Sequence, residues 1–374
     1  MRMGIIEDTY TLMLREMLVF KKNIVPNVVS SVIFPVIFVV LLGSFGSSPK
    51  NVPVAVVNYA SGPTALNFLN LIQSGNGVSV VYETTQQQAM SLLSQDKVAG
   101  VIVIPNGLSA SSSPSIYVYL DNSQPQSAAV VSSQVDLAAA KLGATATFSG
   151  APASDPSPNV ITNYAYGASS NYLSFVVGGV LVMVGSFGAI FSSGFTLLTD
   201  RQMGNLKAFL VTPINEFSVL LSKVMYGTFR SVLSAYIGLV IGLIYGATIA
   251  AGAIGFIELL WIILLVGLGF SALAIALAAR IKQQQNYGLI GQTIIMPLAF
   301  LGGAFVPATL LPSFLQPVVI VNPLTYAVNA VRDIMIKGFL PLSTLISTSA
   351  ILLVFAAAMM FLAFALFKDV SKQI

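Results

Sequence analysis

The chain has 374 residues, of which 56% are hydrophobic and 8% charged, with a formal net charge of +4. Its mean hydropathy of +0.86 excludes a soluble domain of this length, because so few charged groups could not cover so much apolar surface. The absence of cysteine and histidine excludes disulfides, thiolate zinc sites and Ser-His-Asp or Cys-His catalysis. No G-x-x-x-x-G-K-[ST] motif occurs, so the chain carries no P-loop ATPase site. We expect an integral membrane protein that is not an enzyme and binds neither metal nor nucleic acid.

Residues 1–23 are predicted to form an amphipathic helix at the membrane interface. Apolar residues recur there at helical spacing with charged residues between them, and Lys21 and Lys22 end the pattern. The uncharged run at 24–45 is long enough to cross a bilayer. Because no small-residue cleavage site follows it, we expect an uncleaved first transmembrane helix.

Residues 46–170 change in character and are predicted to form an α/β domain inserted between the first two spans. Runs typical of strands alternate with runs typical of helices. The Pro- and Ser-rich segment 149–159 is expected to be a linker back to the membrane. Strands are expected at VPVAVVN, VSVVYE, VAGVIVIP and SIYVYLD, and helices near PTALNFLNLI, near QQQAMSLLSQ and at about 126–148.

The remaining chain, residues 171–374, is predicted to lie almost entirely in the membrane. In the apolar segment 297–342, prolines from Pro297 to Pro323 interrupt the pattern, so no continuous helix can cross through all of them. We expect a broken, re-entrant segment at about 308–325 instead. Five spans are expected in this part, at about 172–198, 224–248, 254–279, 287–307 and 343–367, which makes a membrane α-helical fold of six transmembrane helices.

The basic residues predict the orientation of these helices. They precede the first span, separate the second from the third and the fourth from the fifth, and follow the sixth, which places them on one side. Cytoplasmic loops carry such an excess of lysine and arginine. We therefore expect a multi-pass protein of the cell membrane with both termini in the cytoplasm and residues 46–170 outside. The residues concerned are Arg2, Arg15, Lys21, Lys22, Arg201, Lys207, Lys223, Arg280, Lys282, Lys368 and Lys372.

The expected third span carries Gly238, Gly242 and Gly246 at four-residue spacing. Small residues in this pattern let two helix backbones approach closely. The partner is either another helix of the same chain or a second copy in a homodimer. Arg230, near the inner end of the same span, is expected to extend its guanidinium to the lipid headgroups.

The stretch TDRQMGNLKAFLVTPINEFSVLLSKV lies between the expected second and third spans. It holds basic residues, a glycine, a proline and a short amphipathic core. A loop that only reversed the chain direction would need no more than a few polar residues. It resembles the cytoplasmic loop of ABC-2 type transporter permeases, in which a pattern close to R-x-x-G-x-L-x-x-L-x-x-T-P precedes the third span. The matching residues are Arg201, Gly204, Leu206, Phe209, Leu210, Thr212 and Pro213.

A second segment, NPLTYAVNAVRD, is similar to the N-P-L-x-Y-x-x-x-x-x-R signature before the last span of the same family. The domain between the first two spans looks like the exporter subgroup with large extracellular domains, and the resemblance covers essentially the whole chain. Where the family often has acidic residues in the first motif, this chain has Thr199 and Lys207. The second signature comprises Asn322, Pro323, Leu324, Tyr326 and Arg332.

The resemblance implies a coupling helix at about 200–213 that docks into a groove on a separate P-loop ATPase subunit. Leu206, Phe209 and Leu210 would face that groove. The partner would bind ATP and Mg²⁺, so the chain itself needs no cofactor. A second permease copy, identical or homologous, and membrane lipid complete the expected partners.

The implied function is ATP-driven export of a hydrophobic or amphiphilic substrate, such as a lipid or drug, because few charges occur in the spans. Three alternatives remain open. The loop helix could rest on lipid headgroups, and the whole chain could be a non-transporting scaffold or receptor that presents the external domain. A channel is less supported, because no ring-forming charged residues are evident in the spans.

Overall fold

The computed structural model describes residues 4–22, 24, 36–37, 50–60, 62–75, 77–106, 108, 115–121, 124–148, 158–165, 172–206, 214–305, 307–308 and 311–371. The chain divides into two compact units, Phe45–Phe175 and a helical unit that joins Met1–Ser44 to Val176–Ile374. The expected first transmembrane helix at 24–45 lies almost wholly outside the described residues.

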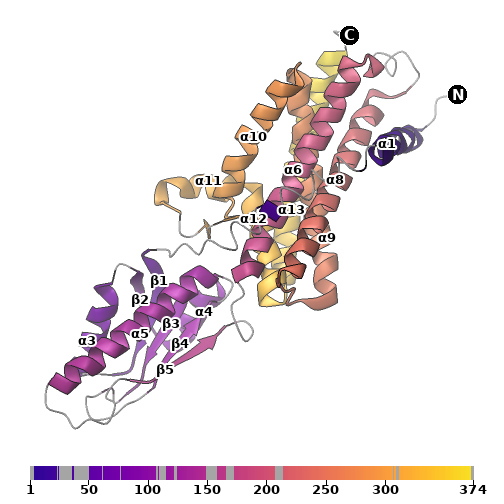
Figure 1. Ribbon diagram of the computed structural model, residues 1–374. Helices are drawn as coiled ribbons and strands as arrows, with labels where there is room; N and C mark the ends of the chain where they lie inside the picture. Colours follow the sequence, from indigo (N-terminus) through magenta and orange to yellow (C-terminus); the bar gives the residue numbers. More distant parts are fainter. Residues whose placement is uncertain are drawn as a thin grey trace. The chain divides into compact units, whose positions relative to one another are not determined.

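The unit Phe45–Phe175 is built on a five-stranded sheet in the order β2-β1-β3-β4-β5 (Figure 1). Strand β1 pairs in parallel with both β2 and β3, β4 runs antiparallel to β3, and β5 runs parallel to β4. The strands are β1 (Val52–Asn58), β2 (Val78–Glu83), β3 (Gly100–Ile104), β4 (Ile116–Leu120) and β5 (Val160–Tyr164), and the helices are α3 (Pro63–Gln73), α4 (Gln86–Ser94) and α5 (Pro125–Phe148).

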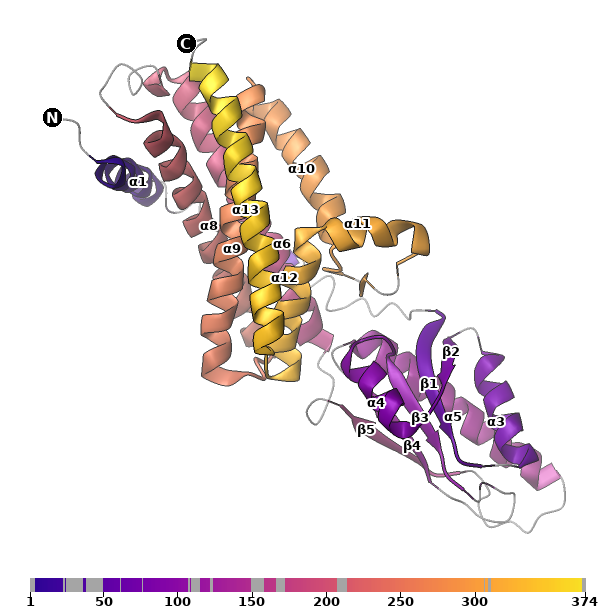
Figure 2. The same cartoon turned by 180° about the vertical axis from the view of Figure 1, so that it is seen from behind.

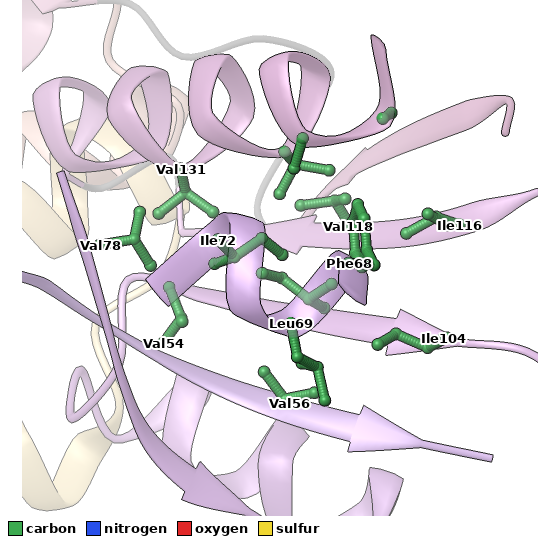
Figure 3. Packing of buried hydrophobic residues seen from close by; sticks show 14 of the residues in the cluster. Val54, Val56, Phe68, Leu69, Ile72, Val78, Ile104, Ile116, Val118 and Val131 are labelled. Carbon is green, nitrogen blue, oxygen red and sulfur yellow. The ribbon is translucent and has the colours of Figure 1, made fainter. Parts of the chain in front are cut away.

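Helices α3 and α4 lie on opposite faces of this sheet. The connection from β1 to β2 and the one from β2 to β3 run in opposite directions across the sheet, and parallel crossovers are almost always right-handed. The first therefore places α3 on one face and the second places α4 on the other. On the α3 face, Phe68 and Ile72 pack with Val131 of α5 and with strand residues such as Val54 (Figure 3). On the other face, Ala89 and Leu93 of α4 pack against strand residues such as Val101.

Strand β5 was not expected from the sequence, since it lies between the predicted linker and the next span. Its residues Val160, Ile161 and Thr162 are β-branched, which favours a strand. The signal is five residues long and follows a Pro- and Ser-rich segment, which explains why it was missed. The other strands and helices of this unit lie at the segments where they were expected.

The helical unit contains four helices among the described residues that are long and apolar enough to cross a membrane, or five if one bent pair counts as a span. The four are α6 (Tyr172–Gln202), α8 (Glu216–Ile244), α9 (Gly252–Arg280) and α13 (Leu342–Ser371) (Figure 1). The span expected at 287–307 is not among them. Its place is taken by α10 (Gln284–Leu301), whose first half carries polar residues that lower its hydropathy: Gln284, Gln285, Asn286 and Gln292.

The expected broken segment is a bent pair of helical pieces in the structure. Ser313–Val321 and Pro323–Lys337 meet at 86° around Asn322. Proline starts the second piece, because its missing N–H costs nothing in the first turn of a helix. The pieces comprise η2 (Ser313–Leu315), α11 (Gln316–Val321), α12 (Pro323–Arg332) and a π-helical turn, η3 (Asp333–Lys337).

Helix α6 is the centre of the helical unit, and α13 lies at its margin against α9 (Figures 1 and 2). In α6, 89% of the most apolar window is buried, compared with 17% in α13. On α13, Val354 is 70% exposed and Phe361 77%. Such exposure is expected of a helix that faces lipid rather than water.

Close helix packing in this unit depends on small residues. A Cβ atom on Gly227 of α8 would lie 1.7 Å from the Ser193 Oγ atom of α6, so only glycine fits there. Gly242 likewise faces Val177 of α6, at 2.7 Å from a built Cβ atom. Gly246 ends α8 with φ +102, and the Ala247 N–H donates to the Gly242 carbonyl over 2.9 Å in a Schellman cap. Gly242 therefore packs within the chain, and Gly246 has a capping role.

Candidate functional site

Four charged side chains from three helices form one ion cluster at the end of the bundle where α6 ends and α8 begins. The Arg15 guanidinium donates to both Asp200 carboxylate oxygens, with Nη2–Oδ1 at 2.8 Å and Nη1–Oδ2 at 3.1 Å. The Lys223 ammonium bridges Asp200 and Glu16. Two cations thus balance two carboxylates. We call Arg15, Glu16, Asp200 and Lys223 the ion cluster.

Burial makes the ion cluster energetically consequential. Glu16, Asp200 and Lys223 are each at most 5% exposed, whereas Arg15 reaches the surface. The Asn205 side-chain amide also donates to Asp200 over 3.1 Å, and the hydrogen bonds to Asp200 raise the pKa of the Arg15 guanidinium. A charged side chain can be buried at low cost only when a group of opposite charge lies beside it. Replacing one member of the ion cluster by an uncharged residue would therefore leave a buried charge without its partner.

Helix α1 (Ile5–Lys22) is held along α8 by contacts on both sides of the ion cluster. The Ser218 hydroxyl donates to the Ile5 carbonyl over 3.2 Å. Farther along α1, the Phe20 ring meets Phe229 edge to face, with centroids 6.1 Å apart. The Arg230 guanidinium lies 4.9 Å from the centroid of the Phe20 ring. The predicted extension of Arg230 to lipid headgroups is therefore wrong, because its side chain is buried and its guanidinium lies against the Phe20 ring of α1.

The third span predicted from hydropathy begins at residue 224 and leaves Lys223 in the loop before it. The structure starts α8 at Glu216, where the Phe217 N–H donates to the Asn215 side chain over 2.9 Å in an N-cap. Two additional helical turns therefore precede the expected start. They bring Lys223 onto the buried face of α8, opposite Asp200.

The loop motif begins directly after the ion cluster. Arg201 lies in the last turn of α6, next to Asp200, and Gly204 ends the helix with φ +77. Leu206 is only 1% exposed and packs within the chain, so it does not contribute to an exposed docking face. The other motif residues, Lys207, Phe209, Leu210, Thr212 and Pro213, lie outside the described residues.

The second signature forms the joint of the bent pair. The Asn322 side chain accepts a hydrogen bond from the Leu324 N–H at 3.0 Å and donates to the Leu298 carbonyl at the end of α10 at 2.7 Å. The Tyr326 hydroxyl donates to the Ile320 carbonyl of α11 over 2.8 Å. Arg332, which is 5% exposed, donates to the Ala304 carbonyl over 3.1 Å. The signature thus ties α10, α11 and α12 together.

Asn322→Ala should lower the stability of the helical unit by about 1–3 kcal/mol. It removes an N-cap, which is worth about 1 kcal/mol, and leaves the part-buried Leu298 carbonyl with the Gly302 N–H as its remaining donor. The loss is measured as the midpoint of thermal unfolding of the purified chain in detergent. Asn329→Ala is the matched control, because Asn329 is exposed on the same helix. An equal midpoint for both variants would contradict the role of Asn322 as the joint.

Glu16 and Asp200 were not among the predicted site residues, and Arg15 and Lys223 entered the prediction only as basic residues that indicate orientation. The available signals were an acid in the last turn of a long apolar helix and an acid on an amphipathic helix. An acid at a helix C-terminus opposes the helix dipole and requires a cation nearby. Among the described residues, no group of three or more His, Cys, Asp or Glu side chains could hold a metal ion. The ion cluster joins helices α1, α6 and α8.

Comparison with known proteins identifies the family. The sequence profile of the ABC-2 family transporter proteins matches residues 28–365. A putative transport permease ycf38 of Cyanophora paradoxa is 28% identical over 164 residues, which are 44% of this chain and 56% of that protein.

Two bacterial ABC transporter permeases are also similar to this chain. The daunorubicin resistance ABC transporter permease protein DrrB1 of Streptomyces coeruleorubidus is 24% identical over 49% of this chain and 65% of its own length. The probable multidrug ABC transporter permease YbhR of Escherichia coli K12 is 25% identical over 49% of this chain and 50% of its own length. The matched parts thus span between half and two thirds of these relatives. The profile match over most of the sequence shows that the chain belongs to the ABC-2 family of transporter proteins and is a multi-pass membrane protein.

Proposed function

We propose that the chain is the permease subunit of an ATP-driven exporter and works with a separate P-loop ATPase subunit. The ATPase docks on the loop between α6 and α8, and its closure on ATP moves that loop. The chain works as a pair of permease copies, and the substrate is hydrophobic or amphiphilic. The relatives named for daunorubicin resistance and multidrug transport support this substrate class.

The observation that carries the proposal is the position of the ion cluster. Asp200 stands immediately before Arg201, the first residue of the loop motif, and joins α6 to α8 through Lys223 and to α1 through Arg15. A displacement of the loop therefore acts on three helices together. Packed interfaces respond to such a push by moving as bodies rather than by deforming.

The loop should face the cytoplasm and the unit Phe45–Phe175 the outside. Arg15, Arg201 and Lys223 gather at the ion-cluster end of the bundle, and Gln284 at the start of α10 bonds there to Thr199 of α6 over 2.9 Å. Basic residues concentrate on the cytoplasmic side of membrane proteins.

The chain has no cysteine, so single-cysteine labelling tests this orientation directly. Ser94→Cys, on the exposed face of α4, should react with an impermeant maleimide in intact cells. Met203→Cys, at a side chain that is 71% exposed, should react only after permeabilisation. Labelling of Met203→Cys in intact cells would overturn the orientation.

Transport itself is tested in inverted membrane vesicles that contain the chain and its ATPase. We expect ATP-dependent uptake of an amphiphile, with daunorubicin and a fluorescent phospholipid as probes. Vesicles without the chain are the control. If ATP drives no uptake of either probe, the chain does not export amphiphiles. The hypothesis of a non-transporting scaffold or receptor would then replace that of an exporter subunit.

A further inference from the structure

Two adjoining hollows open on the unit Phe45–Phe175, at the carboxyl ends of its parallel strands. One hollow, of about 280 Å³, is lined by residues that include Tyr59, Gln86, Asn106, Tyr117 and Tyr119. The other, of about 580 Å³, borders it at Tyr59. Its polar lining consists of Asn58, Glu83, Thr84, Thr85 and Gln88.

The sheet topology explains why a hollow forms there. The chain leaves β1 toward β2 on one side and leaves β3 toward β4 on the other, so the connections diverge between β1 and β3. Open α/β sheets bind ligands outside the carboxyl ends of the strands at such a switch point. Tyr59 directly follows β1, and Pro105 and Asn106 follow β3. The hollow lined by these residues therefore lies where the fold itself leaves a crevice.

The tyrosines share one face of the sheet with α4. Tyr117 pairs with Val103 across β3 and β4, and Tyr119 pairs with Val101. Val101 and Val103 belong to the core under α4, whereas α3 and α5 cover the opposite face. The short helix α4 leaves the tyrosines partly uncovered, with Tyr59 48% and Tyr117 38% exposed.

The polar groups of the tyrosines are available to a ligand. Among the described residues, the hydroxyls of Tyr59, Tyr117 and Tyr119 make no hydrogen bond to the chain. Gln86 and Asn106 add exposed amide groups, each with donors and an acceptor. Tyrosine offers a flat apolar ring and a polar tip, so the lining combines apolar faces with many neutral hydrogen-bonding groups.

The charges of the lining decide the class of ligand. No lysine or arginine lines either hollow in the part of the chain that the structure describes, and Glu83 supplies a carboxylate. Phosphate groups require cations or several converging backbone N–H groups. A nucleotide, the frequent occupant of a switch point, is therefore disfavoured. A neutral ring that carries hydroxyls on its edge and C–H groups on its face fits the lining.

We infer that these hollows bind a neutral saccharide chain, with one sugar ring stacked on the tyrosines and the next toward Glu83 and Thr85. This binding site is additional to the proposed transport function and independent of it. Specific sites of this kind bury an apolar face of the ligand and orient it by a few polar groups. The tyrosines supply that face, and Gln86, Asn106 and Glu83 supply the polar groups.

The test uses the full chain in detergent on an array of immobilised neutral oligosaccharides of glucose, galactose, mannose and N-acetylglucosamine, without ATP or partner. We expect binding to at least one of them, followed by calorimetric titration with that saccharide. Tyr117→Ala should weaken the affinity about tenfold, which corresponds to about 1.4 kcal/mol for the lost ring contact. Gln86→Ala, an exposed change that does not threaten folding, should also weaken it.

Tyr164→Ala is the matched control, because Tyr164 on β5 is 38% exposed, as Tyr117 is, and lines neither hollow. Its affinity should equal that of the unaltered chain. Absence of binding to every neutral saccharide, or equal affinity for Tyr117→Ala, Gln86→Ala and Tyr164→Ala, would overturn the inference. Because the assay contains no ATPase, its outcome is separate from that of the transport experiments.

Discussion

Lys223→Met is expected to destabilise the helical unit by about 3–5 kcal/mol, the usual cost of removing one partner of a buried ion pair. The Lys223 ammonium stands between the Glu16 and Asp200 carboxylates and is itself 2% exposed. Methionine keeps the length of the side chain but leaves two buried carboxylates facing each other. Arg15 still contacts both, yet it is 36% exposed in its side chain and cannot replace a buried cation.

The loss is measured as the thermal midpoint at which the purified chain leaves its monodisperse peak in size-exclusion chromatography. Lys282→Met is the matched control, because it removes a lysine that is exposed. Adding Asp200→Leu to Lys223→Met should recover part of the loss, since it removes one stranded carboxylate. A midpoint for Lys223→Met equal to that of Lys282→Met would show that the ion cluster does not hold the helices together.

Local patterns in the sequence were sufficient for α6, α9 and α13 and for every described element of the unit Phe45–Phe175 except β5. Strand and helix periodicity is a property of neighbouring residues, so the predicted strands VPVAVVN and VSVVYE coincide with β1 and β2. The start of α8 was also readable, since Asn215 followed by Glu216 is a typical N-cap. It was missed because hydropathy, rather than capping, defined the span.

The ion cluster could not be derived in the same way. Glu16 and Lys223 are 207 positions apart in the sequence, and no local pattern reports which acid meets which base. The bend at Asn322 was expected from the prolines, but the hydrogen bonds from Asn322 and Arg332 to α10 and to the residues after it depend on tertiary packing. The burial of Leu206 could not be predicted from the sequence either. An apolar residue in an amphipathic segment can pack against its own chain or against a partner, and the local pattern is the same in both cases.

Phe209→Asp is expected to abolish association of the chain with its ATPase subunit. Phe209 lies outside the described residues, and its docking role follows from the resemblance of the loop motif. Loss of one buried phenylalanine side chain is worth about 2 kcal/mol, and burial of an unpaired carboxylate costs several kcal/mol more. The sum of these two free-energy losses exceeds the net binding free energy of a transient interface of modest size. Insertion should be unaffected, because the change lies in the loop.

The central claim, that this permease is energised by a separate ATPase through the loop after α6, is tested most directly by a pull-down at matched expression. The tagged chain should recover a P-loop ATPase, Phe209→Asp should recover none, and Leu66→Asp should recover as much as the unaltered chain. Leu66 is the control because it is 62% exposed on α3, away from the loop in sequence and in a different unit. Recovery of the ATPase by Phe209→Asp at the level of the Leu66→Asp control would contradict the claim.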